Sequence, residues 1–321
     1  MIITQNIKLP FKPRRKFFDK LFNPETTATI YGNQKWIRKI ALYPRFLPLC
    51  IKTDHSPGIP FDITKDIHTN ARYMFFQSEK YIKEIKKNPV KTSIKLYTNP
   101  LCFYYDNYYK QSDNLIKKGS LYFYAHGNNE VKPTKNINDV IIDLNNLDQK
   151  YQPITICLHY QDLINNVHLD FLNSFKVVCI GNPNDWDYIE NFVREVKKYK
   201  YTFSSNFSSY SLYSIYLGIP FSLIGTESKF INNGDNLIPQ GVYESMNPDS
   251  DYAKYIKKNF VINKINENIS NEDLIFVNEY LGITSNFKRI NFIFYVYYSF
   301  IYSLFRFKFY KKYIQYLIKS I

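Results

Sequence analysis

The chain has 321 residues, with 42 Lys and Arg against 28 Asp and Glu, which gives a formal net charge of +14 at pH 7. Its 30 Tyr and 26 Phe against only 10 Gly exclude a disordered or glycine-rich fibrous protein, and its length predicts two domains. The excess of positive charge indicates an acidic partner.

The first part of the chain alternates short apolar runs with polar or helical stretches. The apolar runs read KIALYPRFLPLCIKT, ARYMFFQS and TSIKLYTNP, and the helical pattern EKYIKEIKKN follows the second of them. Met1–Pro10 lacks the apolar core of a secretory signal, and no apolar run approaches the ~20 residues that a membrane-spanning helix needs. We therefore expect a first domain over residues 1–116 in a protein that stays on the cytoplasmic side.

The segment KTDHSPGIPFD contains two candidate catalytic side chains, Asp54 and His55. They lie in a loop ordered by Gly and Pro, and loops held by a rigid scaffold concentrate catalytic groups. Either side chain could act as the general base that takes a proton from a hydroxyl group. A loop capped by Asp54 next to an exposed histidine is the structural alternative.

From residue 117 onward the alternation becomes regular. The apolar runs read SLYFYAHG, PITICLHY, FKVVCIGN, YTFSSN and PFSLIG, and the helical patterns between them read NDVIIDLNNLDQ, DLINNVHLDFLNS, DWDYIENFVREVKKY and SYSLYSIYLG. Continuous β-branched and aromatic runs separated by helices are typical of a parallel sheet built from βα units. We predict the α/β class with two Rossmann-like domains, the second over residues 117–285.

Polar side chains follow the predicted strands of this second domain, where a doubly wound sheet binds its ligands. The candidate ligand-binding residues in this position are His126, Asn128, His159, Asn182, Ser205, Ser208 and Ser209. An imidazole at His126 or His159 could neutralise or protonate a leaving phosphate, which makes His126 a third candidate catalytic residue. A hydrogen-bonded surface histidine is the alternative for His126.

Five polar residues crowd the start of the helical pattern SYSLYSIYLG. They are Ser204, Ser205, Asn206, Ser208 and Ser209. One N-cap residue suffices to satisfy free backbone N–H groups, so the excess predicts an outside ligand. A helix start carries about half a positive charge and, with hydroxyls alongside, can bind a phosphate without a metal. The alternative is that these residues form only a Ser/Thr turn and a cap.

No pattern in the sequence predicts a metal or cofactor. Asp185–Asp187 match an Asp-x-Asp metal motif, but they open a predicted helix, where Asp serves as a cap. The four cysteines lack CxxC or Cys/His spacing and are predicted to be reduced thiols, mostly buried, which fits a cytoplasmic protein.

The segment 286–321 is predicted to be a basic amphipathic helical segment. There is no Asp or Glu from Tyr280 to Ile321, and the aromatic run NFIFYVYYSFIYSLF lies between clusters of Lys and Arg. Basic residues that flank aromatic turns are typical of interfacial helices, so we expect peripheral binding to anionic lipid at the inner face of the cytoplasmic membrane. The alternative is a helix that packs back across both domains.

Four blocks in the second half resemble a known family. GSLYFYAHGNN, ITICLHYQD, VVCIGNPND and YTFSSNFSSYSLYSIYLGIPFSLIG together resemble the nucleotide-binding half of GT-B glycosyltransferases that build bacterial capsule and lipopolysaccharide. The resemblance covers residues 118–226, and TDHSPGIP and FFQSEKYIKEIKKN are more loosely similar to the acceptor side. The hydroxyl turn is similar to the donor-phosphate turn of bacterial polysialyl- and Kdo-transferases.

The resemblance implies GT-B architecture and metal-independent transfer from a nucleotide-sugar to a glycan or lipid-linked acceptor. The chain lacks the E-x7-E pair of many donor helices, and LHYQD lacks the Pro of the sialyltransferase His-Pro motif, so the donor sugar stays open. A sugar-nucleotide epimerase or a polyol-phosphate transferase on the same fold is an alternative. A basic nucleic-acid-binding protein is a second one, but the chain shows no helix-turn-helix, RNP or zinc pattern, and we expect no nucleic-acid partner.

Overall fold

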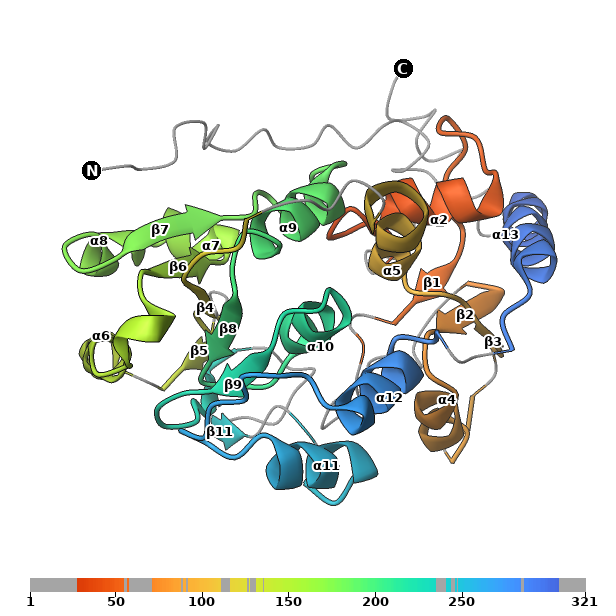
Figure 1. The fold of residues 1–321 in the computed structure, drawn as a ribbon. Helices are drawn as coiled ribbons and strands as arrows, with labels where there is room; N and C mark the ends of the chain where they lie inside the picture. Colours follow the sequence, from red (N-terminus) through yellow and green to blue (C-terminus); the bar gives the residue numbers. More distant parts are fainter. Residues whose placement is uncertain are drawn as a thin grey trace.

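The structure is a computed structural model of the chain. It describes residues 28–54, 57, 71–87, 89–90, 92–110, 116–125, 127, 131–134, 136–234, 241–243, 246, 248–283 and 286–305. These residues form a mixed α/β fold with a five-stranded and a three-stranded parallel sheet and a small antiparallel sheet (Figure 1). The predicted α/β class with parallel sheets is confirmed.

The five-stranded sheet contains the five strands predicted for the second half. They are β4 (Ser120–Phe123), β6 (Ile154–Leu158), β7 (Lys176–Cys179), β8 (Tyr201–Ser204) and β9 (Phe221–Leu223). All are parallel, in the order β7-β6-β4-β8-β9. The chain thus moves outward from β4 in one direction, then crosses back to β8 and continues in the other, which is the order of a doubly wound sheet with a switch point between β4 and β8.

Helices cover both faces of this sheet. Successive strand residues point to opposite sides, so strands that are apolar throughout have two apolar faces to bury. On one face, Tyr122 of β4 and Tyr124, which directly follows the strand, pack with three helices and a 3-10 turn. These are α6 (Ile137–Asn145), α7 (Tyr160–Ile164), α8 (His168–Phe171) and the turn η4 (Gln149–Tyr151). Leu121 and Phe123 pack on the opposite side with α9 (Tyr188–Val196). Both faces are therefore buried, as the continuous apolar strands predicted.

The sequence predicts one helix over DLINNVHLDFLNS, and the structure has two. α7 ends at Ile164, Asn166 has a left-handed backbone with φ 61°, and α8 begins at His168. Asn tolerates this conformation better than most residues because its short polar side chain can bond locally. The expectation of a continuous helix was wrong at this turn.

The first half contains the smaller parallel sheet, in the order β1-β2-β3. Its elements are α2 (Asn33–Ala41), β1 (Lys52–Thr53), β2 (Tyr73–Phe76), α4 (Glu79–Ile85), β3 (Ser93–Leu96), α5 (Pro100–Tyr104) and the π-helical turn η2 (Tyr105–Tyr109). One hydrophobic cluster joins Met74 and Tyr81 of this half to Leu212 and Tyr280 of the second. The core therefore continues across residue 117, and the domain boundaries at 116 and 285 stay predictions.

The antiparallel sheet was not expected from the sequence. β5 (Val131–Pro133), β10 (Phe230–Asn232) and β11 (Gly241–Tyr243) pair in the order β11-β10-β5. These three-residue strands carry no two-residue alternation long enough to stand out from loops. The second half is thus parallel in its main sheet and antiparallel in this addition.

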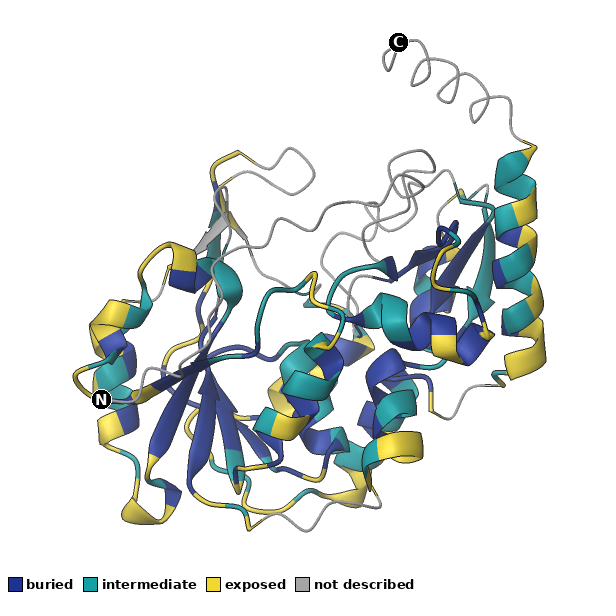
Figure 2. Ribbon diagram, turned by 90° about the horizontal axis from the view of Figure 1, so that it is seen from above, coloured by how far each residue is buried: buried dark blue, intermediate teal, exposed yellow. Residues whose placement is uncertain are grey.

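α10 (Ser209–Tyr216) lies between the two parallel sheets (Figure 1). α12 (Asn271–Tyr280) packs against both α10 and α4, and α11 (Asp251–Asn259) shares their hydrophobic cluster. α13 (Arg289–Leu304) packs against α2 at the far edge of the first half (Figure 2). Its residues Phe292 and Val296 are buried. None of the helices in the described ranges is long and apolar enough to cross a membrane.

Candidate functional site

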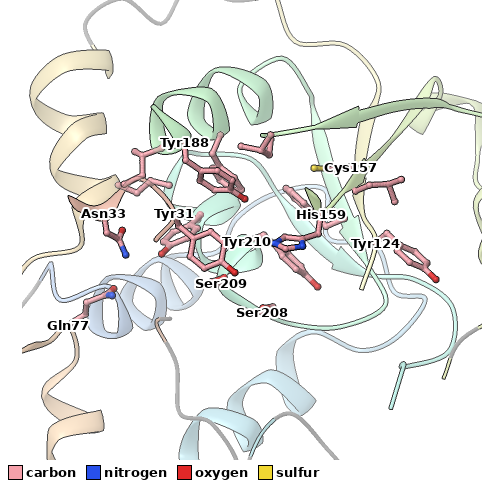
Figure 3. Close-up of a pocket in the computed structure, with 17 residues that line it drawn as sticks. Tyr31, Asn33, Gln77, Tyr124, Cys157, His159, Tyr188, Ser208, Ser209 and Tyr210 are labelled. Carbon is pink, nitrogen blue, oxygen red and sulfur yellow. The ribbon is translucent and has the colours of Figure 1, made fainter. Parts of the chain in front are cut away.

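A cavity of about 230 Å³ lies at the carboxyl edge of the five-stranded sheet (Figure 3). Tyr124 and His159, which follow β4 and β6, line one side of the cavity. Ser208 and Ser209, at the start of α10, also line it. The first half supplies the facing wall through Tyr31, Asn33, Gln77 and Leu101. The cavity therefore combines the predicted edge of the sheet with a wall from the other half of the chain.

The start of α10 brings two of the predicted serines to the cavity. Ser208 is the N-cap residue, its backbone N–H donates to the hydroxyl of Ser211 at 3.1 Å, and Ser209 is the first helical residue. The first N–H groups of a helix have no partner within the helix, and the aligned peptide dipoles make this end positive. The geometry is suited to an anionic ligand.

The other polar residues of this turn make hydrogen bonds within the protein. The Ser204 hydroxyl donates to the carbonyl of Phe123 at 2.7 Å, which ties β8 to β4. Ser205 is 2 % exposed and its hydroxyl donates to Oδ1 of Asn206 at 2.9 Å, while Nδ2 of Asn206 donates to the carbonyl of Ser228 at 2.7 Å. Ser205 therefore has structural contacts and does not line the cavity, unlike Ser208 and Ser209.

His159 lines the cavity as a neutral side chain. It is the N-cap residue of α7, and its Nδ1 accepts the backbone N–H of Gln161 at 3.3 Å, so the ring proton is on Nε2. Burial lowers the pKa of His159 to about 4. At pH 7 the neutral ring can donate a hydrogen bond but does not supply the positive charge that would neutralise a phosphate.

Asp162 completes the cap of α7 behind His159. Its Oδ2 accepts the backbone N–H of His159 at 3.0 Å, and the side chain is almost fully buried. Burial raises the pKa of this carboxyl to about 7, while the backbone hydrogen bond from His159 opposes the shift. Near pH 7 this carboxyl is therefore about half protonated, so the wall beside Tyr124 carries less negative charge than an exposed Asp would give it.

The loop after β7 contacts the first half of the chain. Asn182 accepts the N–H of Asn184 at 2.9 Å through Oδ1 and does not line the cavity, but the next residue, Pro183, accepts the N–H of Tyr31 at 2.5 Å. Tyr31 has a left-handed backbone with φ 55°, an uncommon conformation for a residue with a large side chain. This contact holds the Tyr31 ring at the cavity, 6.5 Å from the His159 ring (Figure 3).

The Asp-x-Asp segment makes a link between helices. Lys35 of α2 forms ion pairs with Asp187, at 2.5 Å, and with Glu190. Asp185 accepts the backbone N–H of Asn182 at 3.1 Å. Among the residues that the structure describes, no group of three or more His, Cys, Asp or Glu side chains is placed to hold a metal ion.

Asp54 lies in a buried polar network at the carboxyl edge of the three-stranded sheet. Its Oδ1 accepts from Nε2 of Gln77 at 3.0 Å and from the Tyr97 hydroxyl at 2.8 Å, and its Oδ2 accepts the backbone N–H of Gln77 at 3.0 Å. Burial first, and then Asp54, raise the pKa of Tyr97 well above its usual value. Asp54 is 1 % exposed and does not line the cavity, but its carboxylate is hydrogen-bonded to Gln77, which does.

The structure thus brings His159, Ser208 and Ser209 together and places Asp54 one side chain away. Asn182 and Ser205 lie outside the cavity lining, and His55, His126 and Asn128 are outside the described residues. Five further lining residues were not predicted from the sequence: Tyr31, Asn33, Gln77, Tyr188 and Tyr213. Gln77 directly follows β2, so the rule that singled out His159 after β6 could have found it.

No family model matches the chain, and no curated protein matches it. Among solved structures, the chain is similar to a crystal structure of UDP-GlcNAc 2-epimerase from Neisseria meningitidis bound to UDP-GlcNAc. The sequence identity is 13 %, the TM-score is 0.31, and the match covers 73 % of this chain and 61 % of the epimerase chain. The match thus spans less than two thirds of the epimerase's length.

Proposed function

We propose that the cavity binds a nucleotide-sugar and that the protein is a metal-independent glycosyltransferase with GT-B architecture. The observation that carries the proposal is the position of Ser208 and Ser209. They begin a helix at the carboxyl edge of a doubly wound sheet, and they face a cavity whose opposite wall comes from the first half. Sheets of this kind bind nucleotides at this edge, and a helix start favours their phosphates.

The phosphates of the donor would lie against the start of α10. The free N–H groups there and the hydroxyls of Ser208 and Ser209 would donate to the phosphate oxygens, and the imidazole of His159 lies in the same lining. This arrangement would stabilise the negative charge that develops on the departing phosphate. No metal ion is needed for that purpose, and His126, which follows β4 in the sequence, would assist.

The aromatic part of the lining would hold the flat parts of the donor. Tyr31, Tyr124, Tyr188 and Tyr210 all line the cavity (Figure 3). Aromatic rings stack on nucleobases and pack against the apolar faces of ligands, and a phenol also offers a hydrogen bond. This lining favours a ligand with a nucleoside and a sugar over a simple phosphate.

The first half would bind the acceptor and supply the general base. The candidates for that base are Asp54 and His55, and the three hydrogen bonds that the Asp54 carboxylate accepts favour His55 for proton transfer and Asp54 for positioning Gln77. A glycan or lipid-linked acceptor of capsule or lipopolysaccharide synthesis, in the cytoplasm, is the substrate class that the sequence resemblance implies.

A ligand screen followed by a product assay tests this function. Thermal-shift measurements with UDP, GDP, CMP, their sugar conjugates and a DNA duplex should show stabilisation by one nucleotide class and none by DNA. Incubation with the matching nucleotide-sugar should release free nucleotide only when an acceptor is present, with or without EDTA. An isomerised nucleotide-sugar formed without acceptor would establish the epimerase alternative, and stabilisation by DNA alone would contradict both.

A further inference from the structure

α13 is apolar on two opposite faces. Phe292 and Val296 are each 1 % exposed and pack into the hydrophobic cluster that contains Ile37, Phe75 and Tyr97. The exposed face of α13 is a row of five large apolar residues: Ile290 at 70 %, Phe294 at 59 %, Tyr298 at 38 %, Ile301 at 48 % and Phe305, just past the helix end, at 76 % exposed. Spacings of four, four, three and four residues place this row along one side of the helix.

A helix on the surface of a water-soluble domain normally turns polar residues outward. α11 does so in this protein, with Lys254, Lys257 and Lys258 exposed while Tyr252 and Ile256 are buried. The outward row of α13 has no charged member, and Figure 2 shows the helix at the edge of the molecule with its outer side exposed. A contiguous exposed apolar surface of this kind indicates a binding partner.

Cations lie beside aromatic residues of α13, and the helix itself, over Arg289–Leu304, has no Asp or Glu. Nζ of Lys95 is 4.6 Å from the ring centre of Tyr295, and the Arg72 guanidinium is 5.6 Å from that of Tyr302. Arg289 begins the helix, where it donates to the carbonyl of Ile40 at 2.8 Å. From Leu281 to the end of the sequence the chain has no Asp or Glu. The partner must therefore offer both an apolar interior and negative charge.

We propose that the exposed face of α13 docks on a membrane surface that contains anionic lipid. The helix would lie along the surface, with Phe292 and Val296 kept in the protein core and Phe294 and Ile301 inserted at headgroup depth. Its 16 residues give a length of about 24 Å, and the aromatic side chains and flanking cations suit the boundary between headgroups and acyl chains.

The charges favour lipid over a second copy of the chain. A symmetric dimer through this face would bring like cations of the two copies together, with no acidic residue on the helix to compensate. The inference does not depend on the nucleotide-sugar site. A protein that binds vesicles but no nucleotide would refute only the proposed function.

Vesicle flotation of the full chain tests the inference. Wild-type protein should float with phosphatidylcholine vesicles that contain 30 mol % phosphatidylglycerol, and less with phosphatidylcholine alone or in high salt. The double variant F294Q/I301Q should lower the partition coefficient by about tenfold or more. The matched control I142Q/I275Q changes residues of α6 and α12 that are 57 % and 64 % exposed and should bind like wild type.

A single-site probe keeps the test valid if the double variant misfolds. In F294W the added tryptophan should shift its emission to shorter wavelength on anionic vesicles and be quenched by brominated lipid. Unchanged flotation of folded F294Q/I301Q, or no response from F294W, would overturn the inference. A wild-type dimer that F294Q/I301Q dissociates, with no vesicle binding by either protein, would overturn it in favour of a second copy.

Discussion

The side-chain nitrogen of Asn99 lies 3.3 Å from the hydroxyl of Tyr213, which joins the carboxyl edge of the three-stranded sheet to α10. The same nitrogen donates to Oε1 of Gln77 at 2.6 Å, and Oδ1 of Asn99 accepts the backbone N–H of Leu101 at the start of α5. The wall from the first half and α10, which begins at Ser209, are therefore hydrogen-bonded to each other beside the cavity.

Substitutions of Asn99 and of Tyr213 should lower the free energy of unfolding by different amounts. N99A removes the N-cap of α5 and leaves the buried Oε1 of Gln77 without the bond from Asn99, so it should lower the free energy of unfolding by about 2–4 kcal/mol. Y213F removes one long hydrogen bond and should cost about 1 kcal/mol or less. Urea denaturation measures both, and equal losses would contradict this description of the network.

Asp54 is expected to position its neighbours. D54N turns one acceptor into a donor opposite the buried N–H and O–H groups of Gln77 and Tyr97, so stability should fall by about 2–3 kcal/mol. The control D187N removes a charge from an ion pair whose Asp side chain is 63 % exposed and should cost less than about 1 kcal/mol. A D54N protein as stable as wild type, with slower turnover, would instead make Asp54 the general base.

The buried carboxyl of Asp162 should make stability depend on pH. Its pKa is about 7 in the folded protein and near 4 when unfolded, so between these values the folded state binds more protons and stability falls as pH rises. D162N keeps an acceptor for the His159 N–H and carries no charge. At pH 8 it should be more stable than wild type, by on the order of 3 kcal/mol.

His159 contributes the opposite slope. Its pKa is lowered to about 4, so the unfolded state binds more protons between pH 6.5 and 4, and stability is lost as pH falls through this range. Denaturation curves from pH 4 to 8 should therefore show D162N losing stability only toward acid. Parallel pH profiles of D162N and wild type would contradict the buried carboxyl.

Gly282 after α12 and Gly218 after α10 both have a left-handed backbone, so they form a matched pair for Ala substitution. A Cβ on Gly282, with φ 71°, would overlap the carbonyl oxygen of Gln77, whereas a Cβ on Gly218, with φ 74°, would meet nothing within 4 Å. G218A should cost only the backbone strain, about 1 kcal/mol. G282A must also displace the residue that lines the cavity, and its thermal midpoint should fall several degrees further. Equal midpoints would refute the close approach.

Most of the main sheet was predictable because its strands are continuous apolar runs. β4, β6, β7, β8 and β9 all lie in the runs from which strands were expected, and buried parallel strands need no polar alternation. β5, β10 and β11 were missed because three paired residues leave no such signal. The break at Asn166 was missed because the apolar pattern continues across it.

The sequence could predict only those site residues whose position is determined by the parallel sheet. His159, Ser208 and Ser209 reach the cavity because parallel strands end at one edge. Tyr31 and Tyr213 come from the first half and from a helix face, so their places depend on how the two halves pack. The serine turn shows the same limit, since composition could not tell Ser205, which bonds inward, from Ser208, which lines the cavity.

Nucleotide binding by wild type and S208A/S209A, measured by calorimetry with the nucleotide selected in the thermal screen, tests the central claim most directly. The double variant removes two hydroxyl hydrogen bonds to a charged group, so its dissociation constant should rise at least about tenfold. The control S270A removes the N-cap serine of α12, which is not a lining residue of the cavity, and should bind like wild type at a comparable thermal midpoint. Equal affinity of wild type and folded S208A/S209A would contradict the phosphate site at α10.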